Sequence, residues 1–295
     1  MTESIHSYVK LLMQSQVKTY SIIGDPVHHS LSPAMQNAAF NSLQLNCTYI
    51  AFRVPKGQLE ESINALRAIG VSGFNVTIPH KVDILRFMDY LDSSAEKATA
   101  VNTVHNVDGI LKGYNTDIFG FIEPLRKRNV NFNGMNILLL GAGGSARAVI
   151  AAFSETKGIN KITIANRTQE KALQLAKKGI DLGVECHVTE MDNIKRIAVE
   201  SHLIVNTTSI GMDQEKEESI IGYEHISKNT IVYDIVYKPV VTDLLENARY
   251  AGADVVYGYE MLLEQGARAF EIWTDLRAPR DVIKKSLLGD FREPV

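Results

Sequence analysis

The chain of 295 residues is long for one compact core and suits two domains, because single domains usually hold on the order of 100–200 residues. Hydrophobic residues make up 45% and charged residues 22% of the chain, a globular balance that excludes a disordered polar chain. The net charge of -3 provides no basic excess for a phosphate backbone, so the expected partners are small molecules and not nucleic acid.

The first part of the chain alternates between strand-like and helix-like segments. Residues 1–17 precede this alternation and lack the order of a signal peptide, so we interpret them as an N-terminal extension. The predicted elements are a strand at 19–24, a helix at 33–43, a strand at 49–54, a helix at 59–69 and a strand at 73–77. Ser32 is the expected N-cap of the first helix, with Pro33 at its first position, and Gly70 closes the second.

The third strand ends before Pro79, because a residue without an N–H would interrupt an interior ladder. Thr77 and Lys81 therefore lie at the carboxyl end of a strand. Further on, the dipeptide Asp108-Gly109 is a hairpin turn signal. The elements predicted here are strands at 102–107 and 110–114, followed by a helix from 115 to about 128.

The second part of the chain repeats the alternation and begins with the unbroken apolar run at 137–140, which suits a central parallel strand buried on both faces. The elements that follow are a helix, a strand at 161–165, a second helix, strands at 184–188, 203–206 and 230–236, a helix at 242–251, a strand at 254–257 and helices at 259–273 and 279–288. This pattern predicts an α/β fold with an N-terminal α/β domain, a Rossmann domain, and C-terminal helices that return to the first domain.

A glycine-rich turn follows the apolar run and opens a helix, in the pattern G-x-G-x-x-A. Glycines in this position allow a tight turn against a pyrophosphate, which the helix N-terminus stabilises. A lone glycine pattern is often an ordinary turn, but the full order of strand, turn and helix predicts a dinucleotide site. Its predicted residues are Gly141, Ala142, Gly143, Gly144, Ser145 and Ala146.

The residues about twenty positions further on distinguish the two nicotinamide cofactors. NAD-selective proteins place Asp or Glu there, on the ribose hydroxyls. This chain has Asn166-Arg167-Thr168, where Arg167 can pair with a 2′-phosphate that a carboxylate would repel. The sequence therefore favours NADP(H) over NAD(H); the alternative is that Arg167 is only a solvated residue at a helix start.

Four polar clusters are not explained by core or turn patterns when they are taken together. They are Ser30-Leu31-Ser32-Pro33, Asn75-Val76-Thr77-Ile78-Pro79-His80-Lys81, Ala100-Val101-Asn102-Thr103 and Gly113-Tyr114-Asn115-Thr116-Asp117. Each has an ordinary explanation by itself, with Ser32 or Asp117 as a helix cap and Lys81 as a surface charge. Their combination ahead of an NADP-type Rossmann half calls for a functional explanation.

In this order the clusters resemble the shikimate dehydrogenase family, which includes the quinate/shikimate dehydrogenases. The resemblance covers about residues 19–273 and includes Asn206-Thr207-Thr208-Ser209-Ile210-Gly211-Met212, Tyr233-Asp234-Ile235-Val236-Tyr237 with Pro239, and Gly258-Tyr259-Glu260-Met261-Leu262-Leu263-Glu264-Gln265. It implies an oxidoreductase that reversibly reduces 3-dehydroshikimate to shikimate with NADPH, in the shikimate pathway to chorismate and the aromatic amino acids.

The resemblance also implies roles for individual residues. Lys81 and Asp117 match the catalytic pair. The residues that match the substrate site are Ser30, Ser32 and Tyr237 at the carboxylate, and Thr77, Lys81, Asn102, Asp117 and Gln265 at the ring hydroxyls and the reacting oxygen. Further expected cofactor residues are Asn166, Arg167, Thr168, Lys171, Thr207, Thr208, Met212, Ile235, Gly258 and Met261, although core packing is an alternative for the two methionines.

The chemistry of ketone reduction explains these residue types independently. Hydride transfer to a carbonyl carbon builds negative charge on oxygen, so a nearby cation or proton donor lowers the barrier, and Lys81 can be both. Asp117 beside it would orient the ammonium and accept a hydrogen bond from the adjacent hydroxyl. A polyhydroxylated ring acid also needs many hydrogen-bond partners, which explains a polar site.

Two departures from the family pattern leave alternatives open. Lys171 stands where NADP-dependent members often carry a second Arg, and it lacks the bidentate fork. Residues 258–261 and 265–267 resemble the quinate-tolerant branch. The alternatives are a broader quinate/shikimate dehydrogenase that uses NAD or NADP, and a non-catalytic sensor of the ring acid, for which the Lys81 and Asp117 pair would have no purpose.

The expected organisation places the site in a crevice between two domains, at the carboxyl ends of the strands. Residues 18–117 with 258–295 form the substrate-binding and catalytic domain, and residues 118–257 form the Rossmann domain. The expected partners are shikimate, 3-dehydroshikimate and NADP(H), with quinate as an alternative substrate, and no metal, membrane or nucleic acid, in a monomer or homodimer. Two cysteines without disulfide or metal-ligand spacing favour a reduced, cytoplasmic setting.

Overall fold

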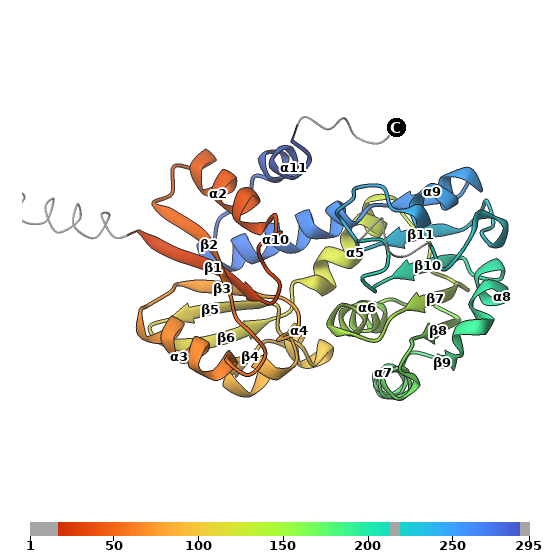
Figure 1. Cartoon of the computed structure of the whole chain (residues 1–295), viewed down its shortest axis with the longest axis horizontal. Helices are drawn as coiled ribbons and strands as arrows, with labels where there is room; N and C mark the ends of the chain where they lie inside the picture. The colour runs from red at the N-terminus through yellow and green to blue at the C-terminus, as the bar shows by residue number, and fades with distance from the viewer. Residues whose placement is uncertain (1–16, 213–218, 290–295) are drawn as a thin grey trace, which may run out of the picture.

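The structure, a computed structural model, describes residues 17–212 and 219–289, so the predicted N-terminal extension lies outside it except for Val17. Two α/β halves lie side by side, and the helices α5 and α10 run between them (Figure 1). The first half contains β1 (Lys18–Gly24), α2 (Ser32–Ser42), β2 (Cys47–Arg53), α3 (Leu59–Ala68), β3 (Gly73–Val76), the 3-10 helix η1 (Asp83–Phe87), β4 (Tyr90–Leu91), α4 (Ser93–Ala98), β5 (Thr103–Val107) and β6 (Ile110–Tyr114).

The first sheet is mixed and has the strand order β2-β1-β3-β5-β6-β4. Its strand β1 pairs in parallel with β2 and β3, whereas β5 is antiparallel to β3 and β6. The β5–β6 hairpin turns at Asp108 and Gly109, whose positive φ angles of 52° and 87° suit a two-residue hairpin turn and confirm the predicted hairpin. One apolar cluster joins this sheet to α2, α10 and α11, and a second joins it to α3.

The second half is a Rossmann-type sheet of six parallel strands in the order β12-β11-β10-β7-β8-β9. Its elements are β7 (Asn136–Leu140), α6 (Gly144–Ser154), β8 (Lys161–Ala165), α7 (Gln169–Asp181), β9 (Cys186–Thr189), the 3-10 helix η2 (Met191–Asn193), α8 (Ile194–Val199), β10 (Leu203–Asn206), the 3-10 helix η3 (Tyr223–His225), β11 (Ile231–Asp234), α9 (Asp243–Tyr250) and β12 (Asp254–Val256). The apolar run predicted as a central strand is β7, and Leu138 and Leu139 face opposite cores. The predicted fold class is therefore confirmed.

The helices α5 (Asp117–Lys127) and α10 (Gly258–Thr274) connect the halves, and α11 (Arg280–Leu288) follows α10 (Figure 1). The last two return to the first half, as predicted, and α11 packs beside α2. Trp273 fixes α10 to the first sheet, because its Nε1 donates to the Val104 carbonyl at 2.9 Å and its ring stacks on Tyr20. A Cβ on Gly73 would lie 2.4 Å from that Nε1, so the close approach requires glycine. Among the described residues, no helix has the length and hydropathy to cross a bilayer.

The structure differs from the sequence-based expectation at the start of α2. The N-cap of α2 is Leu31 and not Ser32, and Leu31 provides no side-chain capping hydrogen bond. Ser32 is the first residue of the helix. Ser30 instead accepts a hydrogen bond at its Oγ from Ser32 N, at 3.2 Å. The elements that the sequence did not predict, β4, α4, α8 and the three 3-10 helices, each span two to six residues, too few to show a hydrophobic period.

Candidate active site

The Lys81 ammonium and the Asp117 carboxylate meet where the turn after β3 faces the start of α5. Lys81 Nζ lies 2.5 Å from Asp117 Oδ2, and the two side chains are only 14% and 6% exposed. Val101 N donates to the Lys81 carbonyl at 2.7 Å, and Asp117 is the first residue of α5, so both backbones are held. Because both side chains are mostly buried, the attraction between the two charges is stronger than at an open surface.

A buried histidine holds the turn that carries Lys81. His80 is 1% exposed and its Nε2 lies 2.7 Å from the Val54 carbonyl oxygen, to which the ring donates. The His80 amide also donates to the Thr77 carbonyl at 3.0 Å, which closes the turn. The sequence placed His80 beside the site but did not predict this anchoring role.

Buried amides and hydroxyls orient the Asp117 carboxylate from its other side. Asn102 Nδ2 donates to Asp117 Oδ1 at 2.7 Å, while Asn102 Oδ1 accepts from Thr116 N at 2.7 Å. Asn75 Nδ2 donates to the Asn102 carbonyl at 3.1 Å, and the Tyr49 hydroxyl donates to Asn75 Oδ1 at 2.7 Å. Burial raises the pKa of Tyr49 well above its ordinary value, so this hydroxyl stays a neutral donor.

A cavity of about 160 Å³, which we call the polar cavity, contains the Lys81–Asp117 pair in its wall. The sequence-predicted residues that line it are Ser32, Thr77, Lys81, Asn102, Asp117, Ser145, Ile235, Tyr237, Gly258, Met261 and Gln265. Ser30 does not line it but touches the backbone of Ser32. Asn75, Val76 and Leu262 also line the cavity. They belong to the motifs that carry the resemblance but were assigned no site role, although a polar Asn75 inside a fully buried strand was a usable signal.

A second cavity of about 300 Å³, the nucleotide cavity, lies at the carboxyl ends of β7, β8 and β10. The predicted residues that line it are Gly141, Ala142, Gly143, Asn166, Arg167, Thr168, Lys171, Thr207 and Thr208. The other lining residues are Leu140, Ala165, Met191, Ser209, Ile210 and Ile220. Arg167 and Lys171 are exposed, which lets two cations meet an anionic group of a ligand.

The backbone of the glycine turn fits a dinucleotide phosphate. Gly141 has a φ of +105°, and a Cβ there would lie 2.5 Å from Thr207 Oγ1, so a side chain does not fit. The helix α6 begins at Gly144, and its N-cap residue Gly143 has no side chain that could cap the first N–H groups. Uncapped N–H groups at a helix N-terminus are a suitable site for a phosphate.

The glycine turn and the Lys81–Asp117 pair touch each other. A Cβ on Gly144 would lie 3.2 Å from Lys81 Cδ, so the Lys81 stem packs directly on the start of α6. Ala146, two residues further along α6, is fully buried in the core and lines neither cavity. Met212 is 55% exposed and also lines neither. Of the two methionines predicted beside the cofactor, only Met261 therefore reaches a cavity wall.

The two cysteines lie outside both cavities. Cys47 is half-buried, Cys186 is buried, and neither forms a disulfide. Burial raises the pKa of Cys186 to about 11, which keeps it a thiol at neutral pH. Within residues 17–212 and 219–289, His, Cys, Asp and Glu form no group of three suited to a metal ion.

Three family models match successive parts of the chain. The shikimate dehydrogenase substrate binding domain matches residues 22–104. The shikimate / quinate 5-dehydrogenase model matches residues 124–239, and the shikimate 5'-dehydrogenase C-terminal domain matches residues 258–288.

Individual relatives align over nearly their whole length. A shikimate dehydrogenase (NADP(+)) of Nitrosopumilus maritimus is 49% identical over 274 residues, which cover 93% of this chain and 99% of that protein. The crystal structure of shikimate dehydrogenase from Aquifex aeolicus matches with a TM-score of 0.85 and 38% identity, covering 92% of this chain and 98% of the other. The Thermus thermophilus enzyme in complex with NADP(H) and shikimate matches with a TM-score of 0.81 and 34% identity, with the same coverage.

Proposed function

The chain belongs to the shikimate dehydrogenase family, and on that premise we propose that it catalyses the reversible reduction of 3-dehydroshikimate to shikimate by NADPH. The observation that carries the proposal is the shielded Lys81–Asp117 pair, 2.5 Å apart, in a polar cavity that touches the nucleotide turn. The enzyme is an NADP-dependent oxidoreductase, as the sequence indicated.

We assign the substrate to the polar cavity. Its carboxylate would lie between Ser32 and Tyr237, with the Ser30 hydroxyl beside them. Its ring hydroxyls and reacting oxygen would face Thr77, Lys81, Asn102, Asp117 and Gln265. This assignment is supported by the shared cavity wall and by the surplus of hydrogen-bonding groups, which a polyhydroxylated ring acid needs and an apolar ligand would leave unpaired.

We assign NADP(H) to the nucleotide cavity and to the adjoining wall of the polar cavity. The pyrophosphate would lie on the glycine turn at 141–143 and the start of α6, and the 2′-phosphate near Arg167, Thr168 and Lys171. The nicotinamide would approach the polar cavity past Ser145, Ile235, Gly258 and Met261, which line its wall. When bound, the cofactor supplies a hydride to the carbonyl carbon.

The residues of the chain handle the proton. As the carbonyl oxygen gains charge, the Lys81 ammonium donates a proton to it, the O–H bond forms and a neutral amine remains. The amine regains its proton from water after release of the alcohol. Asp117, oriented by Asn102, fixes the ammonium and accepts a hydrogen bond from a neighbouring hydroxyl. In the oxidative direction the same amine accepts the hydroxyl proton.

We propose the domain division expected from the sequence: residues 18–117 with 258–295, and residues 118–257. It is supported by the two separate sheets, which end at Tyr114 and begin again at Asn136, and by the packing of α10 and α11 on α2.

Turnover with four pairs of reactants tests the proposed function. Shikimate or quinate is mixed with NADP⁺ or NAD⁺, and reduced cofactor is followed by its absorbance. We expect the highest kcat/KM for shikimate with NADP⁺. A preference for quinate or NAD⁺ would favour the broader quinate/shikimate dehydrogenase. Residues 258–261 and 265–267 leave quinate open as a substrate, and Lys171 leaves NAD⁺ open as a cofactor. Thermal stabilisation by shikimate without turnover in any pair would favour the sensor.

A further inference from the structure

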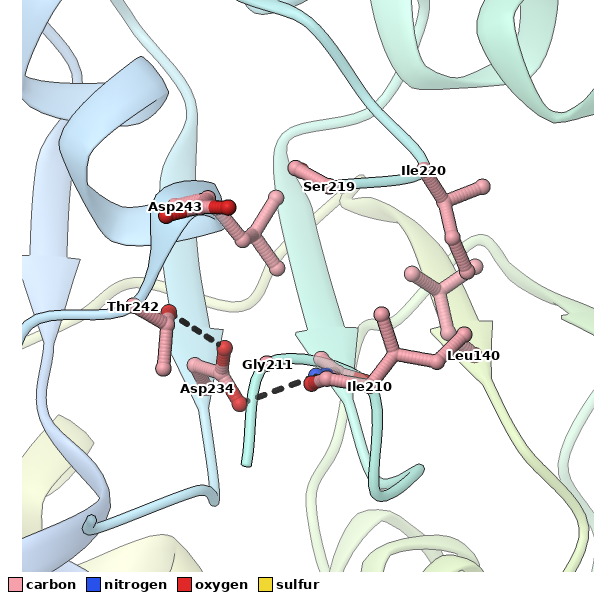
Figure 2. A pocket seen from close by; sticks show the side chains of 10 residues that line it. Leu140, Ile210, Gly211, Ser219, Ile220, Asp234, Thr242 and Asp243 are labelled. Carbon is pink, nitrogen blue, oxygen red and sulfur yellow. Dashed lines mark hydrogen bonds between the residues drawn. The ribbon is translucent and has the colours of Figure 1, made fainter. Parts of the chain in front are cut away.

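A third cavity, of only about 10 Å³, lies in the Rossmann half between the ends of β10 and β11 and the start of α9. Figure 2 shows its lining, with Asp234 and Thr242 facing each other across a hydrogen bond. Asp234 is the last residue of β11 and is 0% exposed. This carboxylate belongs neither to the Lys81–Asp117 pair nor to the groups proposed to contact the substrate or the cofactor.

Within residues 17–212 and 219–289, the donors to the Asp234 carboxylate are all neutral. Oδ1 accepts from Asn206 Nδ2 at 2.9 Å and from Val236 N at 3.0 Å, and Oδ2 accepts from Thr242 Oγ1 at 2.7 Å. Among the residues that line this cavity, Asp243 on α9 is the other titratable group, and it is exposed to solvent. The lining residues from β7, the 206–211 turn, the 219–220 segment and α9 bring no cation to Asp234. Burial of an ionised carboxylate without a cation beside it lowers the stability of the fold, whereas an apolar side chain at the same position would not.

The first of these donors shapes the nucleotide cavity. Asn206 Oδ1 accepts from the Thr208 amide at 3.0 Å and from the Thr208 hydroxyl at 2.7 Å. Asn206 Nδ2, besides bonding Asp234, donates to the Ile210 carbonyl at 3.2 Å. The turn at 206–210, whose residues 207–210 line the nucleotide cavity, is therefore folded around the Asn206 side chain.

The other two donors bracket the segment that enters the polar cavity. Val236 and Thr242 lie on either side of Tyr237, and Ile235 precedes them. Ile235 and Tyr237 line the polar cavity. The same segment is pressed against α10, because a Cβ on Gly258 would lie 2.3 Å from the Val236 carbonyl oxygen. A shift at Asp234 would thus move groups in both cavities.

We propose that Asp234 is a positioning residue of the reaction: its carboxylate joins the turn at 206–210 to the segment at 235–242 and so fixes the nucleotide cavity relative to the polar cavity. This inference rests on the proposed function, because it assigns the two cavities to cofactor and substrate. Asp234 itself touches neither ligand in this account.

Replacement of Asp234 by Asn in the full-length enzyme tests the proposal. The amide keeps one acceptor oxygen and the side-chain shape but loses the charge and one acceptor. We expect the KM for shikimate and the KM for NADP⁺ at pH 8 each to rise about tenfold, since a buried hydrogen bond to a charged group is lost. The melting temperature should stay equal or rise, because the buried charge is removed.

The pH dependence of kcat/KM distinguishes a positioning role of Asp234 from a purely structural role, which would leave this dependence unchanged. Burial raises the pKa of Asp234 to about 6, so the wild-type carboxyl becomes neutral, like the amide, as the pH falls through this value. The ratio of kcat/KM between wild type and Asp234→Asn should therefore shrink from pH 8 to pH 5. A constant ratio, or unchanged KM values in a folded variant, would overturn the proposal.

Two further comparisons complete the test. Thr242→Val removes one donor to Asp234 and should raise both KM values, whereas Thr242→Ser keeps the hydroxyl and should restore them; equal KM values for these two variants would overturn the proposal even if Asp234→Asn did not fold. Asp243→Asn, the matched control beside it, should behave as wild type. An inactive wild type would instead contradict the proposed function, and this inference with it.

Discussion

The shielded pair of Lys81 and Asp117 gives the most direct prediction for a single residue. Asp117→Asn keeps the side-chain shape but cannot fix the ammonium by charge, so kcat should fall by about 10²–10⁴-fold. Steady-state kinetics with shikimate and NADP⁺ measure the loss. The far-ultraviolet circular dichroism spectrum, which reports secondary structure, should remain that of the wild type. A folded variant with wild-type kcat would remove Asp117 from the mechanism.

Arg167 should carry the preference for NADP. Arg167→Ala removes a charge-assisted hydrogen bond to the 2′-phosphate, worth roughly 1.5–3 kcal/mol, so the KM for NADP⁺ should rise by about ten- to hundredfold. The KM for NAD⁺, which lacks that phosphate, should not change. Lys177→Ala, at an exposed position on α7 outside the nucleotide cavity, is the matched control. An equal rise in the KM for NADP⁺ and for NAD⁺ would show that Arg167 does not bind the 2′-phosphate.

Single residues were predictable where a short motif carries the chemistry. The turn at 141–143 reaches its cavity because a few neighbouring residues determine where it lies. The pair of Lys81 and Asp117, 36 residues apart, was predicted from the family resemblance and not from a local pattern. The roles of Asn75 and of the Asn206–Asp234 hydrogen bond were missed, because these hydrogen bonds join segments that are 26 to 28 residues apart in the chain. No local pattern reports a contact over that separation.

The crossing of α5 and α10 gives a prediction for helix packing. A Cβ on Gly120 would lie 2.6 Å from Gln265 Cβ and 2.9 Å from the Met261 carbonyl oxygen. Gly120→Ala should therefore push α10 away, lower the free energy of unfolding by roughly 1–3 kcal/mol and raise the KM for shikimate through Gln265. Denaturant unfolding and kinetics measure the two effects, with exposed Arg126→Ala as the control on α5. Wild-type stability in Gly120→Ala would contradict this packing.

Among the elements, long amphipathic helices and buried strands were predictable, and single-turn elements were not. The helices α3, α5 and α9 carry an apolar face with a regular period, and β7 is an unbroken apolar run. The strand β4 has two residues and α4 has six, so neither repeats a pattern. The antiparallel position of β5 beside β3 depends on long-range pairing, which the hairpin signal alone does not determine.

The stability of the whole molecule should depend on pH through Asp234. Its pKa is about 6 in the folded chain and near the ordinary 3.8 in the unfolded chain, so the folded state binds the proton more tightly. Its ionised form therefore destabilises the fold above pH 6, and this cost disappears as the pH falls. Relative to Asp234→Asn, the wild type should gain on the order of 3 kcal/mol between pH 8 and pH 4. A difference in unfolding free energy that does not vary with pH would contradict the assignment.

The arrangement of the two halves brings one cation from the first sheet against the nucleotide turn of the second. Alternating elements and the glycine pattern predicted both halves, but the contact of Gly144 with the Lys81 stem arises only when they pack. In the proposed mechanism this contact places the proton donor beside the bound dinucleotide.

Single-turnover measurement of hydride transfer in Lys81→Met tests most directly whether Lys81 donates the proton to the carbonyl oxygen. Methionine keeps most of the stem length and removes the ammonium. With saturating 3-dehydroshikimate, and with binding of both ligands verified by calorimetry, the absorbance of NADPH should decay at least 10²-fold more slowly than in the wild type, on the order expected for loss of a general acid. Decay at the wild-type rate with both ligands bound would contradict the role of Lys81.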